Sequence, residues 1–156
     1  SQPRSPKARL LLAEVLEAMG RKKEAVSAYK IALKLDRKKW SLWYRLGTIL
    51  HDEKEYEEAA DCYVEYLGHN PGDVKGWMNL GMALDDMGRP EEACAVFEHG
   101  LKLDPDNLNI WIQKALVYER IGLFEAAYHC YSEVLIRDPK NKVAKGRVKD
   151  LEKQLP

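Results

Sequence analysis

The chain has 156 residues, of which 46% are hydrophobic and 32% are charged, a composition typical of a soluble, helix-rich globular protein. No apolar run approaches the roughly 20 residues that a membrane-spanning helix needs, and no secretory signal is recognisable at the start. The formal net charge is zero, because 25 Lys and Arg balance 25 Asp and Glu.

The start of the chain, up to Lys39, predicts a polar tail followed by two helices. Ser5 and Pro6 suit the N-cap and the first turn of a helix. We expect helices over about residues 7–19 and 23–35, separated at Gly20. Because the sequence begins without methionine, we also expect a processed or excised chain.

Residues 40–107 predict two further helix pairs, and the second of them has the clearest signals. Apolar residues recur at i, i+3, i+4 and i+7 from Trp77 to Leu84, which defines one face of a helix. Gly88 suits the left-handed residue that closes a helix, and Pro90 suits the first turn of the next one. In the preceding pair, Lys54 stands where the other pairs have the turn glycine.

The last part of the chain predicts a fourth helix pair, residues 108–141, and then a single helix, residues 142–156. This last helix lacks the bulky aromatic residues of the earlier ones. It keeps an apolar set of Val143, Val148, Leu151 and Leu155. Such a helix is typical of a cap, which covers the last helix pair with one face and leaves the other to water.

Equivalent residues recur along the chain at a constant spacing. Three helix pairs each have a first-helix tryptophan, a second-helix alanine, a second-helix aromatic residue and a closing proline. In chain order, these sets are Trp43, Ala59, Tyr63 and Pro71, then Trp77, Ala93, Phe97 and Pro105, then Trp111, Ala127, Tyr131 and Pro139. This pattern resembles the tetratricopeptide repeat, a helix–turn–helix of about 34 residues. The sequence departs from it at Lys114, where leucine is usual, and in the first repeat, where Arg9 and Arg37 replace the tryptophan and the proline.

The resemblance implies an all-α fold, an α-solenoid of antiparallel helix pairs with nine helices. We therefore predict one continuous domain made of a polar tail (residues 1–5), four repeats (6–39, 40–73, 74–107 and 108–141) and a capping helix (142–156). Trp43, Trp77 and Trp111 are expected to fill the space between paired helices.

In this family the first helix of each repeat lines a concave ligand groove. The corresponding positions form a stripe displaced by about 120° from the Trp–Leu face. Its members comprise an apolar floor, Tyr44, Met78, Met82, Ile112 and Leu116, and a polar, mostly basic fringe, Arg45, Lys75, Asn79, Asn109, Gln113 and Arg147. An apolar floor suits the side chains of a peptide or an amphipathic helix, and amide side chains can meet a peptide backbone as donor and acceptor. We therefore expect a non-catalytic adaptor or scaffold that binds a peptide or helix of a partner protein. The alternative is that these apolar residues pack against the neighbouring repeat.

One subfamily that binds the C-terminal tails of chaperones can be tested on the sequence. It uses Lys and Asn on one first helix, Asn on the next, and Lys and Arg on the third. The corresponding positions here are Tyr44, Thr48, Asn79, Asn109 and Gln113, or, one repeat earlier, Leu10, Glu14, Arg45, Lys75 and Asn79. Neither set reproduces the clamp, so a chaperone tail is disfavoured as the ligand.

No pattern indicates catalysis, a metal or another cofactor. The histidines, His51, His69, His99 and His129, have no ligand spacing, and no glycine-rich phosphate loop occurs. The cysteines, Cys62, Cys94 and Cys130, are odd in number and widely spaced, which favours a reducing cytoplasm over a disulfide framework. We predict a cytoplasmic protein that is not an enzyme and needs no cofactor.

The uneven distribution of charge leaves two alternative functions open. Residues 1–40 hold 11 Lys and Arg against 4 Asp and Glu (+7), residues 41–107 hold 5 against 15 (−10), and residues 108–156 hold 9 against 6 (+3). Such runs are usually solvated faces. The first alternative is a self-associating solenoid, a homo-oligomer in which the basic start of one copy attracts the acidic middle of another. The second is a nucleic-acid-associated adaptor, which the acidic middle disfavours, so no nucleic-acid partner is expected.

Overall fold

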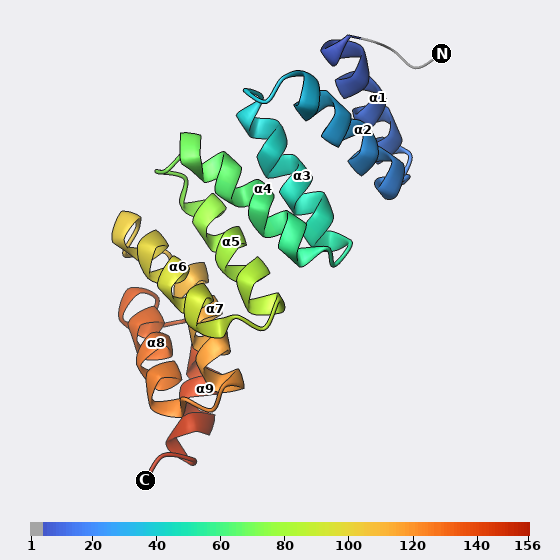
Figure 1. Ribbon diagram of the computed structural model, residues 1–156. Helices are drawn as coiled ribbons and strands as arrows, with labels where there is room; N and C mark the ends of the chain where they lie inside the picture. Colours follow the sequence, from blue (N-terminus) through green and yellow to red (C-terminus); the bar gives the residue numbers. More distant parts are fainter. Residues whose placement is uncertain (1–4) are drawn as a thin grey trace. The chain divides into compact units, whose positions relative to one another are not determined.

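The computed structural model describes residues 5–156, and over that range it consists of nine helices without a strand (Figure 1). The helices are α1 (Pro6–Ala18), α2 (Lys22–Leu35), α3 (Trp40–Asp52), α4 (Tyr56–His69), α5 (Val74–Asp86), α6 (Pro90–Leu103), α7 (Leu108–Arg120), α8 (Phe124–Arg137) and α9 (Lys142–Glu152). The predicted all-α class and helix number are confirmed. Of the predicted polar tail, residues 1–4 lie outside the described residues. Ser5 is the N-cap of α1, and its hydroxyl accepts a hydrogen bond from the Ala8 amide at 3.1 Å.

The chain divides into two compact units, Ser1–Gly76 and Trp77–Pro156, with the boundary inside α5. In the first unit, α1 packs on α2, α2 on α3, and α3 on α4. In the second unit, α6 packs on α7, α7 on α8, and α8 on α9. Each unit is thus a stack of consecutive helices, as expected where no single pair can bury its apolar face alone.

The turn inside each helix pair depends on one residue with a left-handed backbone. This residue is Gly20, Gly88 or Gly122 in three pairs, with φ of +74°, +76° and +80°. In the remaining pair it is Lys54, with φ of +66°. The amide of the next residue, Glu55, donates to the Leu50 carbonyl at 2.9 Å and closes the end of α3 as in the other pairs. The missing glycine therefore leaves the turn unchanged, at the cost of a strained lysine.

The centre of each helix pair is occupied by an aromatic residue of the second helix. Tyr29, Tyr63, Phe97 and Tyr131, which occupy equivalent positions in the four repeats, are all at most 2% exposed. The tryptophans, in contrast, are only half-buried, and Trp111 packs against the buried cluster of α7 and α8, as expected for a residue between paired helices. The indole groups of Trp43 and Trp111 also hold the preceding loop. Trp43 Nε1 donates to the Arg37 carbonyl at 3.0 Å, and Trp111 Nε1 donates to the Pro105 carbonyl at 2.9 Å.

Lys114, on α7, occupies a position where this type of repeat usually has leucine. The residue is only 6% exposed, and its ammonium group donates to Glu98 Oε1 on α6 at 2.6 Å. Its Nζ also lies 5.8 Å from the Trp111 ring centre and 5.6 Å from that of Tyr118. The stem can thus pack like an aliphatic side chain while the charge is neutralised by a neighbouring helix.

The last helix, α9, covers the end of the second unit. Its N-cap is Asn141, whose side-chain oxygen accepts a hydrogen bond from the Ala144 amide at 3.1 Å. Ala144 and Leu151 are buried in the cluster that α7 and α8 form, and Val148 packs against it. Val143, expected on the apolar face, is 56% exposed.

Candidate functional site

The predicted stripe begins in the first unit with Tyr44, on α3. Its ring is half-buried and packs against two rings of α4, with centroid distances of 5.8 Å to Tyr63 and 5.1 Å to Tyr66. The Tyr66 hydroxyl donates to Asp73 Oδ2 at 2.7 Å, and this bond, together with burial, raises the pKa of Tyr66 to about 12. Tyr44 therefore forms a firm aromatic wall between α3 and α4.

Arg45, the next residue of the stripe, is held by acids of the preceding helix pair. Its guanidinium contacts Glu17 at 2.9 Å and Glu14 at 3.2 Å, both on α1, and lies 5.5 Å from the Tyr29 ring centre. The Tyr29 hydroxyl donates to the same Glu17 carboxylate at 2.5 Å. Burial of the Tyr29 ring and this hydrogen bond raise the pKa of Tyr29. Arg45 is thus part of an internal Tyr–Glu–Arg chain rather than an isolated positive charge.

Lys75 is the third member of the stripe in the first unit. It is exposed in the first turn of α5, and its backbone amide donates to Asp73 Oδ1 at 3.0 Å. Asp73 therefore joins Lys75, through the backbone, and Tyr66 at the start of α5.

In the second unit, the stripe continues along α5 and α7. The α5 members, Met78, Asn79 and Met82, are all half-buried. On α7, Ile112 and Gln113 are half-buried, Asn109 is exposed, and Leu116 is 40% exposed. An ion pair between Asp85 of α5 and Arg120 of α7 ties the carboxyl ends of these two helices together. Two neighbouring first helices thus carry methionine, leucine, isoleucine and amide side chains that are partly open to solvent.

The last member of the stripe, Arg147, lies on α9. Its guanidinium contacts Glu119 of α7 at 2.9 Å, and the Tyr131 hydroxyl donates to Glu119 at 2.7 Å. Burial, followed by this hydrogen bond, raises the pKa of Tyr131. The arrangement repeats the one around Arg45, with the same separation in sequence between acid and arginine.

The acidic partners of the two arginines, Glu14, Glu17 and Glu119, were not predicted from the sequence. A signal for two of them was present, because Glu17 and Arg45 are separated by the same number of residues as Glu119 and Arg147. The two arginines were assigned to a basic fringe, but each is neutralised by a carboxylate within its own unit. The fringe of the second unit is therefore mainly amide in character.

The structure also bears on metal binding, membrane crossing and thiol chemistry in the described residues. Within residues 5–156, no group of three or more His, Cys, Asp or Glu side chains is placed to hold a metal ion. No helix in the described part of the chain is both long and apolar enough to cross a membrane. The thiols of Cys62, Cys94 and Cys130 are free and buried, and burial raises the pKa of each.

Comparison with known proteins identifies the class of this chain. Profiles of the tetratricopeptide repeat match residues 1–38, 10–74, 74–107 and 108–141. The chain therefore belongs to the tetratricopeptide repeat family. A search of curated protein sequences gave no match.

Solved structures of this family share the fold at low sequence identity. The crystal structure of MamA matches with a TM-score of 0.83 at 18% identity, covering 91% of this chain and 83% of that one. YrrB, described as a tetratricopeptide repeat protein with an unusual peptide-binding site, matches with a TM-score of 0.75 at 19% identity, covering 96% and 77%. The first tetratricopeptide domain of Spaghetti (RPAP3), bound to the HSP90 peptide SRMEEVD, matches with a TM-score of 0.68 at 18% identity, covering 76% and 94%. These matches confirm the predicted all-α solenoid class.

Proposed function

We propose that this chain is a non-catalytic scaffold that binds a peptide or helix of a partner protein on the first helices of its repeats. The proposal takes residues 6–39, 40–73, 74–107 and 108–141 as the four repeats and 142–156 as their cap. Membership of the tetratricopeptide repeat family supports it, as do two proteins of similar fold, YrrB, which has a peptide-binding site, and Spaghetti, which is bound to an HSP90 peptide. The reducing cytoplasm predicted from the unpaired cysteines is part of the same proposal.

The observation that carries the proposal is the mixed surface of α5 and α7. Met78, Met82 and Ile112 are half-buried, and Leu116 is 40% exposed, so these side chains keep apolar area in contact with water. An apolar surface that remains accessible is typical of an interface, and methionines adapt to irregular partners.

The amides supply the polar part of recognition. Asn79, Asn109 and Gln113 alternate with the apolar residues, and each amide group has both a donor and an acceptor. A peptide backbone offers the complementary pair at every residue, whatever its sequence. We therefore expect the apolar side chains of a ligand to determine specificity and the amides to fix the direction of its backbone. In the first unit, Tyr44 and Lys75 are the corresponding contact residues.

The test is a peptide-display selection against the full chain, followed by binding assays with the peptides selected. We expect Met82→Glu to reduce affinity at least tenfold, because it places an unpaired charge on the apolar floor. Asn79→Ala should weaken binding less. Circular dichroism should report unchanged helicity and melting for both variants.

Ile136→Glu provides the matched control. Ile136 is 71% exposed on α8, a second helix, so the same type of substitution changes an apolar side chain away from the proposed surface. Peptides should bind this variant as they bind the parent chain. Binding that survives Met82→Glu combined with Asn79→Ala, or that is lost equally in Ile136→Glu, would overturn the assignment of the surface.

A further inference from the structure

We propose that a pocket between α2 and α3 is a second binding site, which takes one apolar side chain of an acidic peptide. The pocket lies entirely within the first unit, and none of its residues belongs to the predicted stripe. Its lining consists of Lys30, Leu33, Lys34 and Arg37 from the α2 side and Trp43 and Leu46 from α3.

The size and lining of the pocket determine what fits into it. Its volume is about 260 Å³, and its floor is formed by Leu33, Leu46 and the Trp43 ring. An apolar cavity of roughly 150 Å³ holds benzene, whereas sites for whole cofactors or drug-sized ligands start at about 300 Å³. The pocket therefore has the capacity for one aromatic or branched aliphatic side chain rather than for a complete small molecule.

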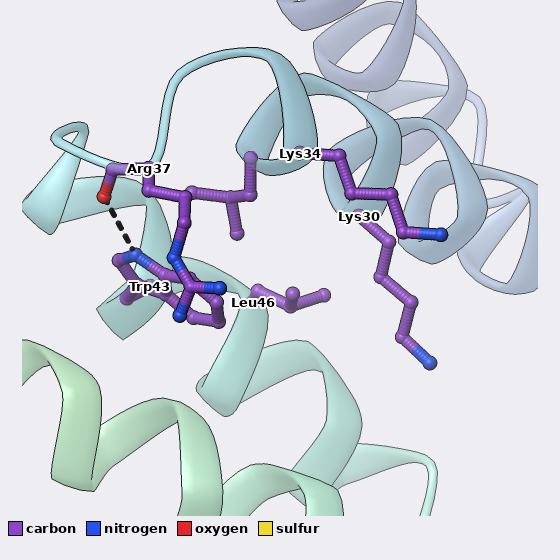
Figure 2. A pocket seen from close by; sticks show the side chains of 6 residues that line it. Lys30, Lys34, Arg37, Trp43 and Leu46 are labelled. Atoms are coloured by element: carbon purple, nitrogen blue, oxygen red, sulfur yellow. Dashed lines mark hydrogen bonds between the residues drawn. The ribbon is translucent and has the colours of Figure 1, made fainter.

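The rim of the pocket is basic. Lys30, Lys34 and Arg37 are spaced at i, i+4 and i+7, which puts them on one side of α2 and the residues after it. Figure 2 shows the Arg37 side chain beside Trp43, with Lys30 and Lys34 extending from neighbouring turns of α2. Carboxylates flanking an apolar ligand residue would meet these three cations.

The existing partners of the rim leave room for ligand carboxylates. Lys30 pairs with Glu58, and Arg37 pairs with Glu65 at 3.4 Å. Both pairs are exposed, with side-chain exposures between 42% and 67%, and exposed pairs of this kind are weak and exchangeable. Lys34 makes no ion pair with any of the residues that the structure describes. Three cations thus face two replaceable acids.

The floor of the pocket is fixed before any ligand arrives. Trp43 Nε1 donates to the Arg37 carbonyl at 3.0 Å, and the Arg37 guanidinium lies 5.6 Å from the Trp43 ring centre. Tryptophan and arginine are among the residues most enriched at the energetic centres of protein interfaces. Because the indole orientation is already held by a hydrogen bond, a ligand would lose little free energy in ordering this side of the pocket.

The basic rim is specific to the first repeat. At the equivalent positions of the second repeat, Lys30, Lys34 and Arg37 are replaced by Val64, Gly68 and Pro71. The later repeats have Glu98, Lys102 and Pro105, and then Ser132, Ile136 and Pro139. The proline closes the repeat in three of the four copies, so folding alone does not account for an arginine at position 37. Its place at the rim, within a segment of net charge +7, favours a ligand of negative charge.

The test follows the indole N–H signal of Trp43 in nitrogen-15 NMR spectra while the peptide acetyl-Glu-Glu-Leu-Phe-Glu-Glu-amide is added to the full chain. The chain has four tryptophans, and the signal of Trp43 is assigned as the one lost in Trp43→Phe. We expect a saturable shift of this signal. A peptide with alanine in place of leucine and phenylalanine should bind at least tenfold more weakly, and so should a peptide with lysine in place of glutamate.

Two charge reversals on α2 provide the matched comparison. Lys34→Glu should weaken binding about tenfold, whereas Lys23→Glu, an exposed position on the same helix outside this pocket, should change it less than twofold. The inference is overturned if the Trp43 signal does not shift, if the alanine peptide binds as well as the parent peptide, or if Lys23→Glu and Lys34→Glu weaken binding equally.

Discussion

Replacing Gly81 by alanine tests how closely α5 packs on α6. A Cβ atom at this position would lie 2.7 Å from Phe97 Cδ1 and closer still to Cε1. Non-bonded carbon atoms are normally about 3.5–4.0 Å apart, so the ring would have to withdraw by about 1 Å. Phe97 is 0% exposed, and a rigid buried ring has no open space to enter. The clash therefore has to be relieved by movement of one helix against the other.

Two opposing terms set the size of the effect of Gly81→Ala on the free energy of unfolding. Alanine in a helix interior is favoured over glycine by about 1 kcal/mol. Overpacking a well-filled core costs about 1–3 kcal/mol, and a contact this short belongs at the upper end of that range. We expect a net destabilisation of about 1–2 kcal/mol, measured as a lower urea midpoint in circular dichroism.

Gly146→Ala is the control for Gly81→Ala. Gly146 also lies inside a helix, α9, but no atom is within 4 Å of the Cβ that alanine would add. This variant should be more stable than the parent chain by up to about 1 kcal/mol, since only the helix propensity changes. Replacing Phe97 by leucine in the Gly81→Ala background should recover part of the loss and give a positive coupling in a double-mutant cycle. The reasoning fails if Gly81→Ala stabilises the chain, or if the two substitutions are strictly additive.

Three further predictions concern a turn, an ion pair between a buried lysine and an exposed glutamate, and a buried thiol. Lys54→Gly should raise the free energy of unfolding by about 1 kcal/mol in urea titrations, because it removes the left-handed lysine, and a loss of stability would contradict this. The hydrogen bond from Lys114 lowers the pKa of Glu98 below its usual value of 4.5. The stabilisation that this bond gives to the folded chain is therefore present above pH 4.5 and is lost as the pH falls through the lowered pKa. Glu98→Gln should therefore destabilise the chain at pH 7 and flatten the pH dependence of its melting temperature below pH 4.5, and an unchanged slope would refute the assignment. Burial raises the pKa of the Cys62 thiol to about 12, so Ellman's reagent at pH 8 should react with it much more slowly than with the same thiol in urea, and equal rates would show that the site opens freely.

The fold was predictable because every helix pair repeats the same local signals. The predicted helices at about residues 7–19 and 23–35 correspond to Pro6–Ala18 and Lys22–Leu35 in the structure. The left-handed turn residues were identifiable as glycines, and the register of the repeat placed Lys54 at the remaining turn. A signal that recurs at a constant spacing supports the same prediction in each helix pair, so a single departure from it does not alter the predicted fold.

The partners of individual side chains were less predictable, because they depend on contacts between helices far apart in sequence. Hydrophobicity alone did not distinguish the half-buried tryptophans from the fully buried residues such as Tyr29 and Phe97. The pattern also marked Lys114 as a departure without identifying Glu98, on the preceding helix, as its partner. For the candidate site, the sequence identified the stripe but left the state of its charges open.

The state of those charges bears on where a ligand would bind. Positions 45, 79, 113 and 147 are equivalent in the register of the repeat, and they hold Arg45, Asn79, Gln113 and Arg147. The two arginines are each bound to a glutamate that also accepts a tyrosine hydroxyl, so they contribute to holding adjacent helices together.

At the two middle positions the repeat has an amide in place of the guanidinium. An amide has no net charge, so partial burial of Asn79 and Gln113 does not require a carboxylate to neutralise it. Of the four equivalent positions, 45 and 147 thus hold ion-paired arginines, whereas 79 and 113 hold neutral donors and acceptors. An arginine at position 113 would add a charge that no glutamate balances in the way that Glu17 balances Arg45. The residue equivalent to Glu17 is Asp85, which already pairs with Arg120. The residue types at these equivalent positions therefore favour a structural role for the two arginines and a role in recognition for the two amides.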